Sequence, residues 1–366
     1  MAPQMASPVR QRAEAMSGGP ALVRGPLKGY HHETYVIWPP GAAGPVKFRE
    51  PRSAGLWFDR RCFQSEEELL RGLKGRIDQV PDIVDIGGLD LQTFIEGRTL
   101  GAYRRWGRRV PDVLFEQIVR LFRHMVPITA DTLHVERRCS PQDAPEDGDS
   151  AGFLRRLVVF AEEQVYAANQ AEFGGLFRDL GVGEESFTRL EESVCGLSER
   201  PFCLLHADLH RENFVVDPRG RLWTIDWELA MVGDPLYDLA THLYLMRLPA
   251  DQEARMVREW CEVVESIRPG SSRGWERDLP LITDFKRAQS LFTDTIRLAL
   301  SLRDESGFRW SALPRAAGKL ERVLGAAAAP IGLASVPGRP QIMAALVRWH
   351  RDLPGSGPRR SGRAGQ

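Results

Sequence analysis

The N-terminal part of the chain alternates between short apolar runs and groups of turn-forming residues, a pattern typical of a small antiparallel sheet. The runs "TYVIW" (34–38) and "PVKFR" (45–49) are rich in β-branched and aromatic residues, and the "PPGAAG" between them favours a turn. "DIVDIGG" (82–88) and "LQTFIEG" (91–97) predict a second pair of strands. Two pairs of strands are therefore expected, with one helix between them.

That helix is predicted in "SEEELLRGLKGRI" (65–77). Ser65 is a good N-cap residue, a glutamate stands three positions later, and the leucines that follow lie on one side of a helix. Beyond residue 97 the apolar residues recur at helical spacing instead, in long segments on both sides of residues 204–228. The pattern changes from strands to helices near residues 94–99, where we expect a hinge.

The predicted fold class is α+β, with a small antiparallel-sheet lobe and a larger, mainly helical lobe. We assign residues 21–97 to the sheet lobe with its one helix and residues 98–353 to the helical lobe. The N-terminal segment 1–20 lacks the apolar core of a signal peptide and is expected to be a disordered leader. The segment 354–366, "PGSGPRRSGRAGQ", is expected to be a disordered basic tail.

Composition narrows the class of protein. The 366 residues are 43% hydrophobic and 27% charged, as in globular proteins, and the 49 basic and 49 acidic residues cancel to a net charge of zero. This balance argues against the strongly basic footprint of a nucleic-acid-binding protein. The five cysteines form no C-x-x-C pair, and no apolar run of about 18 residues occurs, so neither a zinc site nor a membrane span is predicted. We expect a cytoplasmic protein that binds neither nucleic acid nor membranes.

The stretch "LLHADLHRENFVVDPRGRLWTIDWE" (204–228) places a histidine, an asparagine and several carboxylates between short apolar runs. His206, Asp208 and Asn213 have the spacing H-x-D-x-x-x-x-N of a kinase catalytic loop. Asp226 ends the apolar run that follows. Unpaired carboxylates near a core are costly, and Mg²⁺ prefers such hard oxygen ligands. A plain polar hairpin around "DPRG" would explain the turn but not the three residues upstream of it, so a site for Mg²⁺ and a nucleotide is predicted.

The string "LLHADLHRENFVVD…LWTIDWE…GDPLYDLA" resembles the signature of the aminoglycoside phosphotransferase and choline kinase superfamily. The resemblance implies a bilobal protein-kinase-like fold and an ATP-dependent phosphotransferase. It implies that Asp208 is the catalytic base and that Asn213 and Asp226 are the Mg²⁺ ligands. It also implies that His206 orients the catalytic loop and that Asp238, in "YDLA", braces that loop from a helix.

In the sheet lobe the resemblance implies further nucleotide contacts. Lys47, in the middle of "PVKFR", takes the position of the family's ATP lysine, although a lysine there could also be an ordinary exposed strand residue. An acidic residue of the following helix would pair with it. Glu66 fits the family's spacing best, and Glu67 and Glu68 remain alternatives.

The segment "GPLKGYHHETYV" (25–36) takes the position of the hairpin that covers the phosphates, with Gly25 and Gly29 as its glycines. Residues 93–97, "TFIEG", resemble the hinge whose backbone binds adenine, so Thr93 and Ile95 are assigned to the nucleotide site as well. A P-loop enzyme is excluded because G-x-x-x-x-G-K-[ST] does not occur. ATP and Mg²⁺ are the expected cofactors, and ATP is not distinguished from GTP.

The resemblance leaves the acceptor hydroxyl open. It is expected in the helical lobe, near the segments after Met231 and the acidic loop 143–152. Because a net charge of zero argues against a polycationic aminoglycoside, the first hypothesis is a hydroxyl of an antibiotic or other specialised metabolite, in resistance or biosynthesis. The second is a kinase of Ser/Thr side chains in a precursor peptide, acting with a partner lyase as in lanthipeptide biosynthesis. A catalytically silent kinase-like scaffold is disfavoured, because the central residues are all present: Lys47, Asp208, Asn213 and Asp226.

Overall fold

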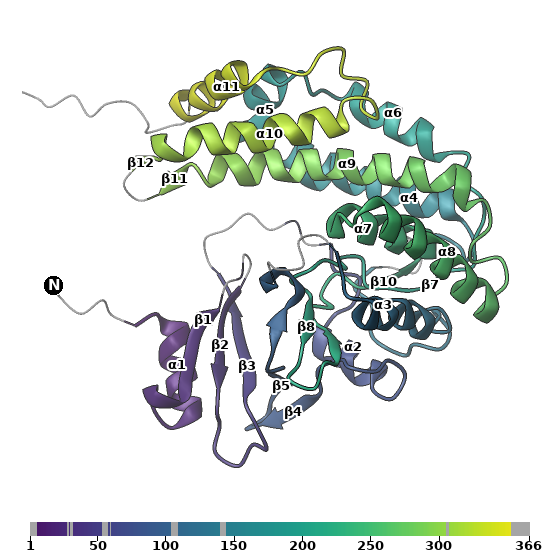
Figure 1. Cartoon of the computed structure of the whole chain (residues 1–366). Coiled ribbons are helices and arrows are strands. Elements are labelled where there is room, and N and C mark those ends of the chain that lie inside the picture. The colour runs from purple at the N-terminus through teal and green to yellow at the C-terminus, as the bar shows by residue number, and fades with distance from the viewer. Residues whose placement is uncertain are drawn as a thin grey trace, which may run out of the picture. The chain divides into compact units, whose positions relative to one another are not determined.

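The computed structural model describes residues 6–27, 29, 32–52, 58, 60–103, 109–139, 144–304 and 307–352. The chain forms two compact units (Figure 1). Unit 1 contains Met1–Asp149 and Glu199–Arg273, and unit 2 contains Ser150–Ser198 and Gly274–Gln366. The expected helical lobe, 98–353, is therefore divided, because its first part and the central motif belong to the same unit as the sheet.

Unit 1 begins with a five-stranded sheet in the order β1-β2-β3-β5-β4, in which every neighbouring pair is antiparallel (Figure 1). The strands are β1 (Val23–Leu27), β2 (His32–Ile37), β3 (Val46–Pro51), β4 (Ile83–Ile86) and β5 (Leu89–Thr93). Each of the predicted runs contributes a strand. Val46 and Phe48 of β3 are buried in the core of this sheet. Lys47 and Arg49 alternate with them and therefore project from the opposite face.

The core face of the sheet is covered by helix α1 (Pro8–Ser17), which begins at the N-cap Ser7 and buries Ala13 against the strands (Figure 1). The prediction of a disordered leader over residues 1–20 is therefore wrong for residues 8–17. Val9, Ala13 and Met16 pack on the same cluster and are spaced for one side of a helix. This apolar side is short and interrupted by polar residues, so the sequence pattern alone did not predict it. The predicted tail, 354–366, lies outside the described residues.

Helix α2 (Glu66–Leu73) connects the two strand pairs in sequence, as predicted. The Ser65 hydroxyl accepts hydrogen bonds from the backbone N–H groups of Glu67 and Glu68, at 3.1 and 3.2 Å. The leucines of the helix are buried together with Glu66, whereas Glu68 is exposed. The amphipathic pattern of α2 thus directs one acidic side chain, Glu66, into the protein.

The rest of unit 1 surrounds the central motif with short strands and helices. A three-stranded antiparallel sheet contains β6 (Arg98–Thr99), β8 (Phe214–Val216) and β9 (Leu222–Thr224), and a separate antiparallel pair contains β7 (Cys203–Leu205) and β10 (Met231–Gly233). The helical elements are α3 (Asp112–Met125), α7 (Pro235–Met246), α8 (Ala250–Ile267) and the 3₁₀ turns η1 (Pro20–Leu22) and η2 (Leu100–Ala102). The loop between β7 and β8 carries the predicted catalytic residues.

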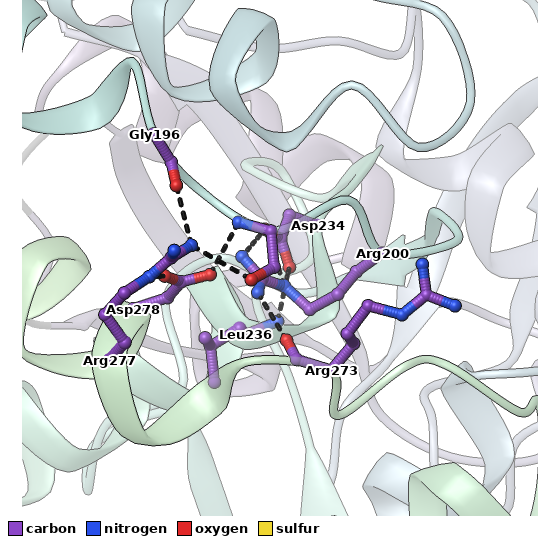
Figure 2. Close-up of polar contacts among 8 residues, drawn as sticks. Gly196, Arg200, Asp234, Leu236, Arg273, Arg277 and Asp278 are labelled. Atoms are coloured by element: carbon purple, nitrogen blue, oxygen red, sulfur yellow. Dashed lines mark hydrogen bonds and ion pairs between the residues drawn. The ribbon is translucent and has the colours of Figure 1, made fainter.

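A buried ion pair fixes the beginning of α7 (Figure 2). The Arg200 guanidinium donates to both carboxylate oxygens of Asp234, at 2.8 and 2.6 Å, and to the carbonyl oxygen of Arg273 at 2.7 Å. Asp234 also accepts from the backbone N–H of Leu236 at 2.9 Å, which caps α7. Both charged side chains are fully buried, so loss of either partner would leave an uncompensated charge at a cost of about 3–5 kcal/mol.

Unit 2 is built from helices around an aromatic core. Its elements are α4 (Ser150–Phe160), the π-helical η5 (Ala161–Tyr166), η6 (Ala167–Asn169), α5 (Gln170–Asp179), α6 (Glu185–Val194), α9 (Trp275–Leu300), β11 (Arg303–Asp304), β12 (Gly307–Phe308), η7 (Trp310–Ala312), α10 (Leu313–Ala327) and α11 (Arg339–Asp352). Phe187 and Phe292 stack with their ring centroids 4.5 Å apart. Asp278 in the first turn of α9 accepts hydrogen bonds from the Ser198 N–H and from Arg277 (Figure 2).

Strands are concentrated in the first part of unit 1 and helices form most of the remaining described chain, so the α+β fold class is confirmed. Within the described ranges, no helix combines the length and the apolar character that crossing a bilayer requires.

Candidate active site

The loop between β7 and β8 begins at His206 and is held by Asp238 of α7. One carboxylate oxygen of Asp238 accepts from the backbone N–H of His206 at 3.1 Å, and the other accepts from that of Ala207 at 2.8 Å. Ala207 is buried and has a φ of +63°, a left-handed conformation that costs a non-glycine residue roughly 1–2 kcal/mol. The two hydrogen bonds stabilise this conformation, and the predicted role of Asp238 as a brace for the loop is confirmed.

His206 is enclosed by the protein. Its ring centroid lies 4.6 Å from that of Trp227, and its Nε2 atom lies 3.1 Å from the carbonyl oxygen of Ile225. Burial lowers the pKa of His206 to about 4, so at neutral pH the ring is neutral and its Nε2–H donates to that carbonyl. His206 therefore connects the catalytic loop to the segment that contains Asp226. In this buried position His206 can orient the loop, but it cannot exchange protons with a substrate.

Asp208 and Asn213 are in direct contact further along the loop. The Asn213 Nδ2 group donates to the Asp208 carbonyl oxygen at 3.0 Å and to its Oδ2 at 3.3 Å, which leaves the Asn213 Oδ1 atom for another ligand. His210 Nε2 lies 3.4 Å from the same Oδ2. Burial opposes the charged form of His210, but the hydrogen bond and charge of Asp208 outweigh burial and raise the pKa of His210. The sequence pattern did not predict this contact of His210. The available signal was "DLH", which places His210 two residues after Asp208.

Asp226 projects from the end of the segment after β9 and has a φ of +67°. Burial and the nearby Glu66 raise the pKa of Asp226, while the charges of Lys47 and Arg49 oppose that rise. In the part of the chain that the structure describes, no N–H or O–H group donates to this carboxylate. A half-buried carboxylate without donors is unfavourable unless a cation completes it, so Asp226 fits a metal ligand.

Glu66 connects α2 to both the sheet and the Asp226 segment. Its Oε1 accepts from the backbone N–H of Trp227 at 2.7 Å. Its Oε2 lies 2.5 Å from Arg49 Nη2, an ion pair whose angle does not make a hydrogen bond. Burial would raise the pKa of Glu66, but Arg49, together with Lys47, lowers it to about 2.

The predicted partner of Glu66 was Lys47, and this assignment requires correction. Among the described residues, the cation within ion-pair distance of Glu66 is Arg49, which also lies 3.1 Å from Glu67 and 3.8 Å from Glu228. Both cations project from the same face of β3, but the planar guanidinium can contact several carboxylates at once. Lys47 instead acts electrostatically on Asp226, more strongly than Arg49 does.

These residues meet at a cavity of about 640 Å³ within unit 1. Its wall contains charged and polar side chains, among them Lys47, Arg49, His210, Asn213, Asp226 and Glu228. It also contains apolar ones, among them Leu27, Pro81, Phe94, Ile95, Val215 and Ile225. Gly29 and Thr93 also line it, so six of the predicted site residues share one cavity: Gly29, Lys47, Thr93, Ile95, Asn213 and Asp226.

The remaining predicted residues lie elsewhere. Glu66 lines a neighbouring cavity of about 130 Å³, and Asp208 contacts Asn213 from outside the wall. Gly25 is not in the wall of the larger cavity, so its assignment to direct nucleotide contact is not supported. It has a φ of +143°, and a Cβ there would lie 2.8 Å from Tyr35 Cδ1. Gly25 instead permits the irregular pairing of β1 with β2, between Arg24 and Leu27.

Glu228 is a further carboxylate that the sequence pattern did not single out, although it ends the motif "IDWE". It lies 3.8 Å from Arg49 Nη1 and 3.9 Å from His32 Nδ1. Burial, followed by the charge of Asp226, raises the pKa of Glu228 to about 7. The cavity wall therefore contains two carboxylates that repel each other, Asp226 and Glu228, together with the two cations Lys47 and Arg49.

A model of the phosphotransferase enzyme family matches residues 23–277, which is more than half of the 366 residues. The chain therefore belongs to the phosphotransferase enzyme family. At the level of the family, this confirms the enzyme class that the sequence predicted, a phosphotransferase with an alcohol group as acceptor. No curated protein sequence gave a significant match.

Solved structures of low sequence identity share the fold. Ethanolamine kinase from Plasmodium vivax has a TM-score of 0.55 and 11% identity, with 84% of this chain and 82% of that chain covered. A thermostable mutant of aminoglycoside phosphotransferase APH(4)-Ia, in a ternary complex with ADP and hygromycin B, has a TM-score of 0.51 and 14% identity, with 90% of this chain and 100% of that chain covered. The predicted kinase-like fold is thereby confirmed.

Proposed function

We propose that this protein transfers the γ-phosphate of ATP to a hydroxyl group of an antibiotic or other specialised metabolite. The observation that carries the proposal is the shared cavity. A cavity with the dimensions of a small-molecule site has both charged residues, including Lys47 and Asp226, and apolar residues in its wall. A nucleotide likewise combines a charged triphosphate with a base that packs against apolar groups.

The residues around Phe94 suit adenine. Phe94 is fixed by the hydrogen bond from its backbone N–H to the Pro45 carbonyl oxygen at 2.9 Å, which holds the adjacent Thr93 and Ile95 at the cavity. Within the described part of the chain, the Ile95 N–H has no protein acceptor, so it can donate to a base nitrogen. The APH(4)-Ia structure contains ADP, which supports a nucleotide in this position.

In the same cavity wall, Asn213 and Asp226 would hold Mg²⁺. The fit rests on the Asp226 carboxylate, which has no donor among the described residues, and on the Asn213 Oδ1 atom, which its own Nδ2 bonds leave free. The metal would neutralise charge on the phosphates. Lys47 would bind phosphate oxygens directly, while Arg49 keeps Glu66, and through it the Trp227 backbone, in position.

Asp208 would accept the proton of the acceptor hydroxyl. Its Oδ2 atom receives the Asn213 amide and lies near His210, so the carboxylate is oriented before the substrate arrives. Most of the acceleration would come from this positioning and from charge stabilisation, because phosphoryl transfer needs little covalent participation by protein groups.

The kind of acceptor is proposed from the net charge of the protein. A net charge of zero gives no long-range attraction for a polycation, so a neutral or moderately charged metabolite is favoured. The presence of Lys47, Asp208, Asn213 and Asp226 in one arrangement disfavours a silent scaffold. A cytoplasmic location fits an enzyme that uses ATP.

The test is transfer of labelled phosphate from ATP to a panel of acceptors: aminoglycosides, macrolides, nucleoside antibiotics, choline, ethanolamine and Ser/Thr-rich peptides. We expect label on a neutral or singly charged metabolite and none when Mg²⁺ is removed with EDTA. Label on a peptide would contradict the metabolite hypothesis and support a precursor peptide as the acceptor. Salt-sensitive transfer to an aminoglycoside would contradict the charge argument, and a failure to bind ATP would contradict the proposed function.

A further inference from the structure

Two of the five cysteines form a pair that has no role in the chemistry described above. Cys62 lies in the segment that leads into α2, and Cys139 lies between α3 and α4. The Cys62 thiol makes a hydrogen bond with the Cys139 thiol. Both are free thiols, so the two sulfur atoms are in contact without being bonded to each other.

The backbone holds the two segments together independently of the thiols. Phe63 and Arg137 form an antiparallel bridge, and the Arg138 N–H donates to the Cys62 carbonyl oxygen at 2.9 Å. Residues opposite each other in such a pairing have Cα atoms about 4.5–5.5 Å apart, and a disulfide requires Cα atoms about 4.4–6.8 Å apart. Cys139 directly follows Arg138, so a bond between the two cysteines would leave the pairing of the segments intact.

The two thiols differ in their accessibility and in their surroundings. Cys139 is exposed, whereas Cys62 is half-buried. The hydrogen bond with Cys139, followed by burial and the charge of Cys139, raises the pKa of Cys62, while the nearby Arg60 and Arg137 oppose that rise. Because a thiolate is the attacking species and needs access to its target, Cys139 is the thiol that reacts first with a dissolved reagent.

We propose that Cys62 and Cys139 are a dithiol that small-molecule disulfides convert reversibly into an intramolecular disulfide. The Cys139 thiolate attacks one sulfur of the small-molecule disulfide, which gives a mixed disulfide and releases one small thiolate. The Cys62 thiolate then attacks the Cys139 Sγ atom, which forms the Cys62–Cys139 bond and releases the second small thiolate. The two protein thiols lose two electrons and two protons, and the small-molecule disulfide takes up the electrons as it becomes two thiols. An excess of small thiol reverses both steps.

The second step is favoured by the first. In the mixed disulfide Cys139 carries neither a negative charge nor a thiolate that accepts a hydrogen bond, so two of the causes that raise the pKa of Cys62 are removed. The charges of Arg60 and Arg137 remain and stabilise the Cys62 thiolate. In a reducing compartment a disulfide of this kind is transient and senses redox state.

The disulfide would restrain the beginning of α2. Cys62 lies between Arg60, whose Nη1 donates to Tyr237 Oη at 2.9 Å, and Ser65, which caps α2. Glu66, which connects α2 to the Asp226 segment, directly follows that cap. Neither cysteine lines the larger cavity, so oxidation would restrain the helix that carries Glu66 without entering the cavity.

The test is incubation of the full-length protein with oxidised glutathione, alkylation of the remaining thiols and mass spectrometry of peptides without reduction. We expect a peptide pair linked through Cys62 and Cys139, and its loss after treatment with dithiothreitol. Cys62→Ser should stop at a glutathione adduct on Cys139. Cys139→Ser should leave Cys62 alkylated as a free thiol. Because residue 139 is exposed, this second variant should keep the fold, which circular dichroism checks.

Cys195→Ser is the matched control. Cys195 is also an exposed free thiol, but its sulfur contacts Arg155 and the Glu191 carbonyl oxygen and not another thiol. The variant should form the linked peptide as wild type does. Separate glutathione adducts on Cys62 and Cys139 in wild type, or no reaction at either, would overturn the proposal.

Hydrogen exchange measures the restraint. Oxidation of wild type should slow exchange of the α2 amides, residues 66–73, and leave those of α3 unchanged. Cys139→Ser treated with the same reagent should show no slowing. Equal α2 exchange in reduced and oxidised wild type would overturn the restraint of the helix.

Discussion

At the scale of single residues, the proposed chemistry depends most directly on Asp208. Asp208→Asn keeps the size of the side chain and its contact with Asn213 but removes the proton acceptor. General-base catalysis contributes about 10²–10⁴-fold, so kcat should fall by that factor while nucleotide affinity stays near the wild-type value. Steady-state kinetics and calorimetry on the same preparation measure the two quantities. A variant that kept wild-type turnover would show that another group accepts the proton.

Glu228 predicts a pH dependence of stability. Burial and the charge of Asp226 raise the pKa of Glu228 from the usual glutamate value of 4.5 to about 7. Between these two pH values the folded state retains a proton that the unfolded state has released, so this group makes the free energy of unfolding fall as the pH rises. Glu228→Gln cannot ionise and should exceed wild type by about 3 kcal/mol at pH 8, with no difference at pH 4.

Urea unfolding in EDTA at both pH values measures this difference. The chelator is needed because a bound cation would stabilise the charged form of Glu228 and hide the effect. If wild type and Glu228→Gln showed parallel stability between pH 4 and pH 8, Glu228 would have an ordinary pKa in the folded state.

The sequence predicted those site residues whose positions depend on local spacing. Asp208 and Asn213 stand on one tight loop, so the spacing of the motif determines that they meet. The partner of Glu66 could not be predicted in this way. Lys47 and Arg49 share one face of β3, and the choice between them depends on side-chain reach and on the angle of α2, which no local pattern contains.

At the scale of elements, Arg49 links β3 to α2. Arg49→Met would leave Glu66, whose side chain is 2% exposed, without its ion-pair partner. Removing one member of a buried pair costs about 3–5 kcal/mol, so the free energy of unfolding should fall by about 3 kcal/mol, with partial recovery in Arg49→Lys. Lys47→Met should lose less stability and should chiefly raise the KM for ATP.

Chemical denaturation and ATP kinetics on the three variants test this division between the two cations. The opposite result, in which Lys47→Met unfolds most easily and Arg49→Met mainly loses ATP affinity, would restore Lys47 as the partner of Glu66.

Helix α1 gives a second prediction at this scale. Ala13 is fully buried against the sheet, whereas Ala15 on the same helix is exposed. Ala13→Asp would bury a charge without a partner and should destabilise the protein by several kcal/mol, on the order of 3. Ala15→Asp should change stability by less than about 0.5 kcal/mol. Equal urea midpoints for the two variants would mean that α1 is not docked on the sheet.

The elements were predicted unevenly for a physical reason. Strands β3 and β5 and helix α2 have strong signals in the local sequence. For α2 these signals include the Ser65 N-cap. Helix α1 has a short apolar side, and its stability comes from burial of Ala13 on a sheet that the local sequence does not reveal. Its existence is a tertiary effect.

At the scale of the whole molecule, the described residues that line the nucleotide-sized cavity all belong to unit 1. Binding of ADP with Mg²⁺ should therefore slow hydrogen exchange at the hinge, residues 93–97, and in the catalytic loop, residues 206–213. Amides of α10 and α11 in unit 2 should exchange at unchanged rates. Mass spectrometry of peptides from both units, with EDTA as the metal-free control, measures the pattern. Protection confined to unit 2 would place the nucleotide elsewhere.

The segment order of unit 1 has a consequence for its synthesis. Its sheet is encoded before Asp149, but Asp234 and Asp238, which anchor α7 and the catalytic loop, belong to Glu199–Arg273. At about 5–20 residues per second, a ribosome needs roughly 6–25 s to extend the chain from residue 149 to residue 273. Until the end of that interval unit 1 is incomplete, because the last acceptor of Arg200, the Arg273 carbonyl oxygen, has not yet been synthesised. Chaperones that shield exposed apolar surface would therefore act on this intermediate.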